Sequence, residues 1–161
     1  MERILDENDF IVSKTDKKGR ITYCNRIFMK LAEYEEEELI GQAHNIIRHE
    51  KMPRAVFKLL WQRIEKKEEI FAFVINKTKK NNYYWVYANV TASLDKDGNI
   101  VGYYSVRRKP NKDAVKAMEL VYSEMIRIES TQSVDAAISY LNEILEKKGV
   151  SYDEFIINLQ G

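Results

Sequence analysis

The stretch DKKGRITYCN, residues 16–25, places a polar turn with a glycine directly before a short run of strand-forming residues. The run FIVSKT at 10–15 precedes this turn and also contains β-branched and aromatic residues. Two such runs joined by a polar turn with a glycine are typical of a β-hairpin. The sequence therefore predicts two antiparallel strands, 10–15 and 20–24, near the start of the chain.

Helical spacing follows this hairpin. Apolar residues recur at helical spacing over 25–40, Gly41 closes that stretch, and residues 42–51 show no clear period. Pro53 fits the first position of another helix, because its missing N–H needs no partner there. The period then changes to two over 70–78, 83–94 and 99–109, which predicts three more strands. This order predicts an α+β fold, a five-stranded antiparallel sheet with helices on one face.

A helical extension is predicted after Pro110. An apolar seam there recurs at spacings of 4, 3, 4 and 3, the heptad pattern, and consists of Ala114, Met118, Val121, Met125 and Ile128. Further helices are expected over 133–148 and after Ser151. The seam can cover the sheet of the same chain or contact a partner, and we favour the second. The chain thus divides into an N-terminal cap (1–8), a main domain (9–110) and a C-terminal helical extension (111–161).

Composition excludes several classes of protein. Lys and Arg number 26 against 25 Asp and Glu, and this near balance argues against nucleic acid as a partner, which requires a concentrated basic face. The one cysteine, Cys24, cannot form an internal disulfide, and no apolar run is long enough to insert into a bilayer. We therefore expect a cytoplasmic protein. No phosphate-binding or nucleophile motif is present, so we do not expect an enzyme.

Several motifs, in order along residues 9–109, resemble a PAS domain. DxxGxIxYxN at 16–25 and YxxxELIG at 34–41 are similar to the opening of that fold. HNIIRHxxMP at 44–53, with Phe57 and Trp61 beyond it, resembles the aerotaxis-receptor subgroup. YYWVxAN at 83–89 and GYxSVR at 102–107 resemble the same subgroup. On this basis the chain is identified as a PAS domain of the aerotaxis-receptor type.

The resemblance implies a sensor domain at 9–110 that binds FAD without a covalent bond and reports redox state in aerotaxis or energy taxis. We expect no membrane anchor in this chain, and in this it is similar to bipartite energy-taxis systems, where a PAS-only protein works with a separate membrane-bound chemotaxis transducer. We expect such a transducer as the partner. The extension at 111–161 is then expected to serve signalling or dimerisation, and a homodimer is a further option.

The candidate flavin site rests on strand alternation together with this resemblance. Alternate residues of a strand share a face, so an inward Asn76 brings Val74 and Ala72 inward with it. On the next strand the smaller, more apolar set at 84, 86, 88 and 90 is expected inside, with Trp85 and Tyr87 outside. The predicted site consists of Asn25, Arg48, His49, Phe57, Trp61, Phe71, Asn76, Val86, Ala88, Ser105 and Arg107.

The resemblance gives particular roles to some of these residues. It places an amide at Asn76, where it can donate to and accept from the edge of the flavin ring. Arg48 and His49 match positions linked to FAD binding, and an arginine can grip a pyrophosphate with two parallel hydrogen bonds. Phe71 stands where the aerotaxis receptor has a tryptophan, and it offers less stacking area and no N–H.

Other interpretations stay open at this point. FMN can replace FAD, and a single histidine, His44 or His49, can ligate haem in a gas sensor. A cofactor-free PAS module would instead fill its core with side chains and act only in protein interaction. Light-sensing LOV domains attach their flavin to a cysteine in an Asn-Cys-Arg-Phe motif. That motif is absent here, so Cys24 is expected to be a packed structural thiol.

Overall fold

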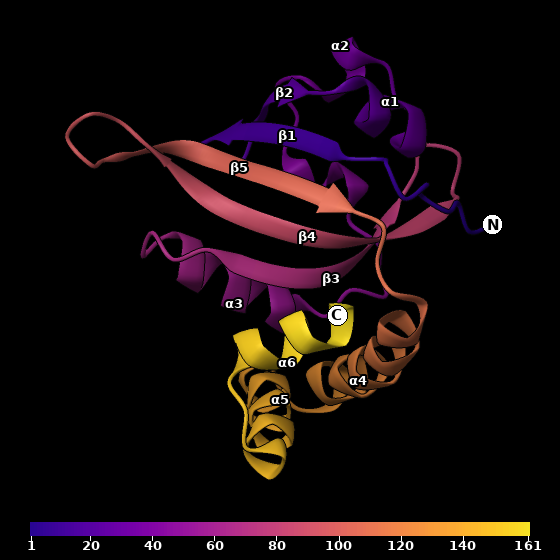
Figure 1. Ribbon diagram of the computed structural model, residues 1–161, viewed down its shortest axis with the longest axis vertical. Helices are drawn as coiled ribbons and strands as arrows, with labels where there is room; N and C mark the ends of the chain where they lie inside the picture. The colour runs from indigo at the N-terminus through magenta and orange to yellow at the C-terminus, as the bar shows by residue number, and fades with distance from the viewer.

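Five antiparallel strands form one sheet in the computed structural model, which describes residues 1–161. The strands are β1 (Ile11–Asp16), β2 (Ile21–Cys24), β3 (Ile70–Lys77), β4 (Tyr83–Leu94) and β5 (Ile100–Arg108). Their order across the sheet is β2-β1-β5-β4-β3, so the first hairpin joins the later three strands through the β1–β5 pair (Figure 1). The predicted α+β fold with a five-stranded antiparallel sheet is confirmed.

The turn between β1 and β2 is held by Asp16. Its carboxylate accepts hydrogen bonds from the backbone N–H groups of Lys18 at 2.9 Å and Arg20 at 3.0 Å. Gly19 has a φ of 81°, in the left-handed region that glycine adopts without strain. A Cβ at Gly19 would lie 3.5 Å from the ring of Trp61. The turn that decides the start of the fold therefore also packs against the helical middle of the domain.

Four short helices connect β2 to β3. They are α1 (Arg26–Ala32), α2 (Glu36–Leu39), the 3₁₀ helix η1 (His44–Ile47) and α3 (Arg54–Ile64). The continuous helical stretch predicted over 25–40 is thus wrong, because Glu33 adopts a φ of 63° and ends α1. The carboxylate of Glu33 accepts a 2.8 Å hydrogen bond from Nδ2 of Asn82, on the loop before β4. Local periodicity does not report a tertiary contact of this kind.

The register of the strands defines the inner face of the sheet. Asn76 pairs with Tyr84 and Val74 with Val86, and directly opposed residues of an antiparallel pair lie on the same face. The pairs Ala88–Arg107 and Val90–Ser105 extend this face across β5. The inward sets expected on β3 and β4 therefore lie on the inner face, and Ser105 and Arg107 of β5, expected inward from the resemblance, share that face. Trp85 lies on the other face, where its ring stacks on that of Tyr122, with centroids 6.1 Å apart.

The N-terminal segment contacts the start of β4 and the C-terminal end of α1. The backbone N–H of Arg3 donates to the carbonyl of Tyr83 at 2.7 Å. The Arg3 guanidinium donates to the carbonyls of Lys30 and Leu31, at the C-terminal end of α1, at 2.7 and 2.8 Å. Leu5 is buried in the core. These contacts tie the predicted cap at 1–8 to α1 and β4.

The C-terminal extension folds back along β3, the edge strand of the sheet. It consists of α4 (Lys112–Thr131), α5 (Val134–Lys148) and α6 (Tyr152–Gln160), which lie beside β3 and α3 (Figure 1). The seam residues Ala114, Met118, Met125 and Ile128 are all buried within the chain. The seam therefore covers the chain's own domain, the first of the two roles considered for it.

No helix has the length and apolar character that crossing a membrane requires.

Two tyrosine hydroxyls bind backbone carbonyls on the free edge of β3. Tyr122 of α4 donates to the carbonyl of Phe73 at 2.6 Å, and Tyr152 of α6 donates to that of Phe71 at 2.8 Å. An uncovered edge strand presents unpaired backbone groups that invite pairing with another chain. The C-terminal helices satisfy these groups within the chain.

Replacement of Tyr122 by phenylalanine is expected to lower the free energy of unfolding by about 1–3 kcal/mol, because the buried carbonyl of Phe73 loses its donor. Tyr23→Phe is the matched control, since Tyr23 is 46% exposed and its change should be nearly neutral. Urea denaturation of both variants measures the difference. Equal stability of the two variants would show that the edge bond contributes nothing.

Candidate functional site

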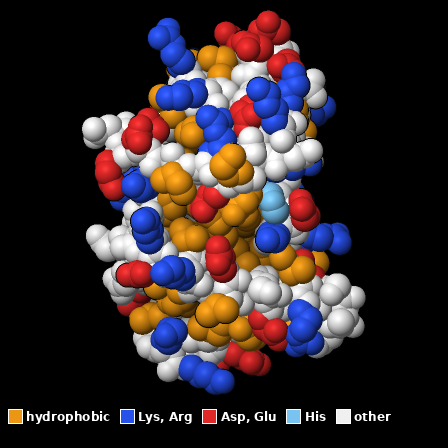
Figure 2. All heavy atoms as spheres, turned by 90° about the vertical axis from the view of Figure 1, so that its right-hand side faces the viewer, with side chains coloured by type: hydrophobic (Ala, Val, Ile, Leu, Met, Phe, Trp, Pro, Cys, Tyr) orange, Lys and Arg blue, Asp and Glu red, His pale blue; other side chains and the backbone are white.

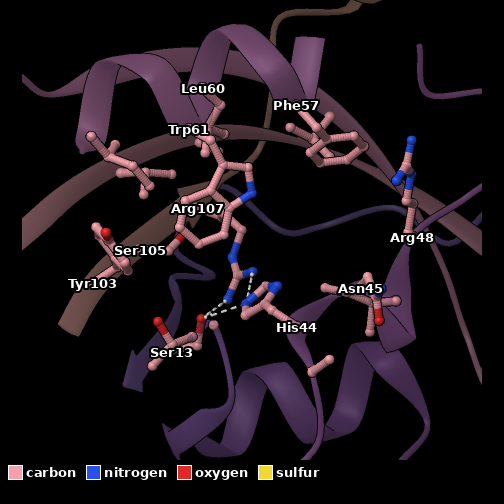
Figure 3. Close-up of a pocket in the computed structure, with 18 of the residues that line it drawn as sticks. Ser13, His44, Asn45, Arg48, Phe57, Leu60, Trp61, Tyr103, Ser105 and Arg107 are labelled. Carbon is pink, nitrogen blue, oxygen red and sulfur yellow. Dashed lines mark hydrogen bonds between the residues drawn. The ribbon is translucent and has the colours of Figure 1, made fainter. Parts of the chain in front are cut away.

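A cavity of about 280 Å³ lies between α3 and the inner face of the sheet. Its α3 side is apolar and consists of Phe57, Leu60, Trp61 and Ile64, which recur at helical spacing and share one face of the helix. The sheet side presents Val74, Ala88 and Val90. Figure 3 shows Phe57, Leu60 and Trp61 pointing from α3 toward the cavity. The volume lies just below the range of about 300–1,000 Å³ that is typical of small-molecule sites.

The opposite end of the cavity is polar and centres on Arg107. This residue is 3% exposed, and its Nη2 donates to Oγ of Ser13 at 2.7 Å. Its Nη1 lies 3.2 Å from Nε2 of His44, and Ser13 Oγ lies 2.9 Å from the same nitrogen (Figure 3). The guanidinium carbon lies 4.7 Å from the centre of the Phe28 ring beneath it. The strands β1 and β5 and the helix η1 therefore converge on one buried cation.

The charge states of these groups follow from burial. Desolvation, with the adjacent Arg107 cation, lowers the pKa of His44 to about 3, so the imidazole is neutral at physiological pH. A neutral His44 accepts at Nε2 from both Ser13 and Arg107, which places its proton on Nδ1. Burial also lowers the pKa of Arg107 to about 10, and the guanidinium still stays charged at pH 7.

This cation has no carboxylate partner in the cavity, because no Asp or Glu is among the lining residues. Nε of Arg107 and Oγ1 of Thr15, which also lines the cavity, are buried without a hydrogen-bond partner. A buried charge or polar group without partners costs free energy. The polar end of the cavity is therefore chemically suited to a ligand with acceptor atoms and negative charge.

His44 is expected to make stability fall with acidification. Its folded pKa of about 3 lies below the ordinary histidine value of 6.5, so the unfolded chain binds more protons between these values. The His44 contribution is complete above pH 6.5 and falls by up to about 1.4 kcal/mol per pH unit below it. Denaturation of the parent and of His44→Gln between pH 4 and 7 measures this. Parallel curves for the two proteins would contradict it.

Asn76 lies on β3 at the inner face, 4% exposed, and lines the cavity. The backbone of Arg48 forms an isolated bridge with that of Asn76, which brings the segment after η1 to the edge of β3. The Arg48 guanidinium carbon lies 4.4 Å from the centre of the Phe57 ring. Arg48 therefore lies at the mouth of the cavity, next to its apolar wall (Figure 3).

A second, more open cavity of about 480 Å³ shares Asn45 and Arg48 with the first. His49, Arg54 and Lys77 also line it, together with Glu50 and Glu129, so three cationic side chains (Arg48, Arg54 and Lys77) face two carboxylates there. The two cavities therefore adjoin at Asn45 and Arg48.

The structure brings most of the predicted site residues to the first cavity. Those that line it are Arg48, Phe57, Trp61, Asn76, Ala88, Ser105 and Arg107. His49 lies instead in the second cavity, where its Nδ1 accepts from the backbone N–H of Lys51 at 3.0 Å.

Three predicted residues lie outside both cavities. Asn25 caps α1, and its Oδ1 accepts from the N–H groups of Val12 and Phe28 at 3.0 and 3.1 Å. Phe71 stacks on Tyr87 at the outer face, with ring centroids 5.6 Å apart. Val86 is fully buried in the core.

Sequence reasoning missed Ser13, Thr15 and His44 as site residues. Ser13 and Thr15 lie on the same face of β1 as Ile11, which is fully buried. Polar residues in phase with a buried isoleucine were therefore a usable signal for the site. His44 had no such signal, because η1 lies in a stretch without a period.

Comparisons with known proteins agree with this fold. Residues 1–108 match the family described as the PAS fold. The aerotaxis receptor of Escherichia coli K12 is 34% identical over 121 residues, which are 75% of this chain and 24% of the receptor. A nitrogen fixation regulatory protein of Klebsiella pneumoniae is 23% identical over 65% of this chain and 21% of its own length. The chain thus spans about a quarter of the length of these relatives.

Solved structures give the same fold. The light-state structure of the Aureochrome1 LOV photoreceptor domain superposes with a TM-score of 0.59 at 26% identity, covering 69% of this chain and 88% of that one. A light-oxygen-voltage domain studied with a flavin analogue superposes with a TM-score of 0.60 at 23% identity, covering 68% of this chain and 82% of that one. With its sheet order, its cavity beneath α3 and its matched residues 1–108, the chain belongs to the PAS family.

Proposed function

We propose that this PAS domain is a flavin-binding redox or energy sensor that signals to a chemotaxis-type transducer. The observation that carries the proposal is the cavity beneath α3, which joins an apolar wall to a buried cation with an unpaired N–H. The similarity to the aerotaxis receptor and to a domain studied with a flavin analogue supports the same ligand class.

The residues fit a flavin ring in three respects. Phe57, Leu60 and Trp61 offer an apolar face for a planar ring. The Asn76 amide can donate to one atom of the ring edge and accept from another. Arg107 supplies positive charge and the free Nε–H for a carbonyl oxygen or a ring nitrogen.

When bound, a flavin supplies reversible redox chemistry. Arg107 favours negative charge next to it, and the Asn76 amide can rotate to exchange donor for acceptor. A change of redox state that alters charge or hydrogen bonding in the cavity therefore changes the contacts of Arg107 on β5 and of Asn76 on β3.

FAD fits this chain better than FMN. The adenosine diphosphate part of FAD needs room and positive charge beyond the ring cavity. The second cavity offers room, and the cationic Arg48, Arg54 and Lys77 on its walls outnumber its two carboxylates, Glu50 and Glu129. These basic residues do not belong to a large basic surface, because Lys and Arg are interspersed with Asp and Glu over the face drawn in Figure 2.

The structure argues against other chemistries that this cavity suggests. Cys24 lies at the end of β2, is 7% exposed and does not line the cavity, so it is not placed to attach a ring there. Nε2 of His44 already accepts from Ser13 and Arg107, and haem ligation would have to break both contacts. We further propose that the protein is cytoplasmic and not an enzyme.

Titration of the flavin-free protein with FAD and with FMN tests the proposal. FAD is expected to bind more tightly, and Arg48→Gln should weaken both flavins by about tenfold or more, because each carries a phosphate and a charged hydrogen bond to it is lost. Arg26→Gln, an exposed arginine on α1, is the control. A protein that binds neither flavin would defeat the proposal and leave a cofactor-free interaction module.

A further inference from the structure

Helix α3 is bound by three carboxylates, one from each C-terminal helix, and none of them lines the first cavity. Glu129 lies on α4, Asp135 on α5 and Asp153 on α6. We call these residues the acidic clamp. Their partners on α3 are spread from its first turn to its last, so the clamp spans the whole helix.

Glu129 binds the first turn of α3. Its two oxygens accept from the backbone N–H groups of Arg54 at 3.1 Å and Ala55 at 2.6 Å. The residue before α3 is Pro53, whose side chain cannot accept these bonds. The first N–H groups of a helix have no partner within it, and a carboxylate there also meets the positive end of the helix dipole. Glu129 therefore caps α3 from 75 residues away.

The other two contacts hold the middle and the end of α3. Nζ of Lys58 lies 2.7 Å from Oδ1 of Asp135, in an exposed pair that contributes little by itself. Nη2 of Arg63 donates to both oxygens of Asp153, at 2.8 and 3.1 Å, with the Arg63 side chain 22% exposed. The adjacent Tyr152 binds the edge of β3, so α6 joins α3 to the sheet.

The same helix carries the apolar wall of the cavity. Leu60, Trp61 and Ile64 face the cavity, whereas the clamp binds the backbone of the first turn and the side chains of Lys58 and Arg63. Figure 1 shows α3 between the sheet and the C-terminal helices. Packed interiors shift as units, so a wall helix displaced by the contents of the cavity must strain or release these contacts.

We infer that α3 couples the cavity to α4–α6, and that the acidic clamp makes the docking of the C-terminal helices depend on what fills the cavity. This inference rests on the proposed function only for the identity of the ligand. Coupling between two sites is reciprocal, so weakening the clamp must also change the affinity of the cavity for its ligand.

The first test uses the flavin-free protein and amide hydrogen exchange read by mass spectrometry. Glu129→Ala is expected to speed exchange in the first turn of α3 and across residues 134–160 by about tenfold, the effect of losing one helix cap. Glu124→Ala is the matched control, because Glu124 binds Arg127 of its own helix. The same exchange pattern in both variants would overturn the inference.

The second test fills the cavity without a ligand. Val90 lines the cavity and packs with the cluster that contains Ile64, so Val90→Phe should press on α3 and alter exchange across residues 134–160 by about threefold or more. Glu129→Ala should abolish this response. Ala88→Val is a milder filling for use if Val90→Phe does not fold. A filling that changes exchange in α3 but leaves 134–160 unchanged would refute the coupling.

The third test adds FAD to the parent protein. Exchange across residues 134–160 is expected to change, and Asp153→Ala, a change to a clamp residue that lines neither cavity, should change the dissociation constant for FAD by at least about threefold while Glu124→Ala does not. If FAD does not bind, the proposed function fails, whereas the cavity-filling test still decides the coupling. Binding of FAD without a response at 134–160 refutes the coupling alone.

Discussion

Replacement of Arg107 by methionine is expected to weaken flavin binding by roughly 10- to 100-fold, the loss of one or two charged hydrogen bonds. The same change should leave the free energy of unfolding of the flavin-free protein unchanged or higher. Arg107 is a buried cation without a carboxylate in its cavity, and removing such a charge relieves a desolvation cost. Methionine retains much of the apolar bulk against the Phe28 ring.

Arg108→Met is the control for this experiment. Arg108 is the next residue of β5 but is exposed on the other face, with its guanidinium carbon 5.4 Å from the Tyr87 ring centre. Flavin titration and urea denaturation of both variants separate binding from folding. If the Arg107 variant binds flavin as tightly as the Arg108 variant, the Arg107 cation does not contribute to flavin binding.

Replacement of Phe28 by alanine is expected to lower the free energy of unfolding by about 3–5 kcal/mol, the cost of a large cavity in a packed core. Phe28 is fully buried on α1, beneath the guanidinium of Arg107 and 5.9 Å from the ring of His44. The change therefore removes both core packing and the floor of the polar end of the site.

Phe10→Ala is the matched control, because Phe10 is 49% exposed and its truncation should cost about 0.5 kcal/mol or less. Denaturant titration of the flavin-free variants gives the two values. Similar losses in both variants would contradict the packing role of Phe28.

The strands and their faces could be predicted because a strand reports its two faces in alternate residues. Period two placed Ala88 on the inner face of β4 and put Val74 and Ala72 in phase with Asn76 on β3, whereas the inward placement of Arg107 on β5 came from the resemblance. The same rule could not place Phe71 at the site, since it is one residue out of phase with Ala72 and faces outward onto Tyr87. Its expected role came from resemblance alone.

The polar end of the site could be predicted only in part. His44 meets Ser13 and Arg107 across 31 and 63 residues of sequence, in a segment without periodicity. Such a contact depends on how η1 lies against β1 and β5, which no local pattern encodes. The split between α1 and α2 is similar, because Glu33 is fixed by Asn82 rather than by its neighbours.

The C-terminal extension shows how one pattern serves two interpretations. The seam on α4 has heptad spacing, and within the chain it is buried against the domain itself. The heptad pattern predicted an apolar face correctly but did not predict what covers it. A signalling role for residues 111–161 stays a prediction, and the acidic clamp on α3 gives it a physical route.

The visible absorption spectrum of the purified protein, recorded before and after chemical reduction, tests the central claim most directly. The account predicts an absorption band in the blue that bleaches on reduction, and release of FAD when the protein is denatured. Flavin-free preparations should regain the band when FAD is added. A colourless protein that stays colourless with added flavin would contradict the account, and a sharp haem band would contradict it as well.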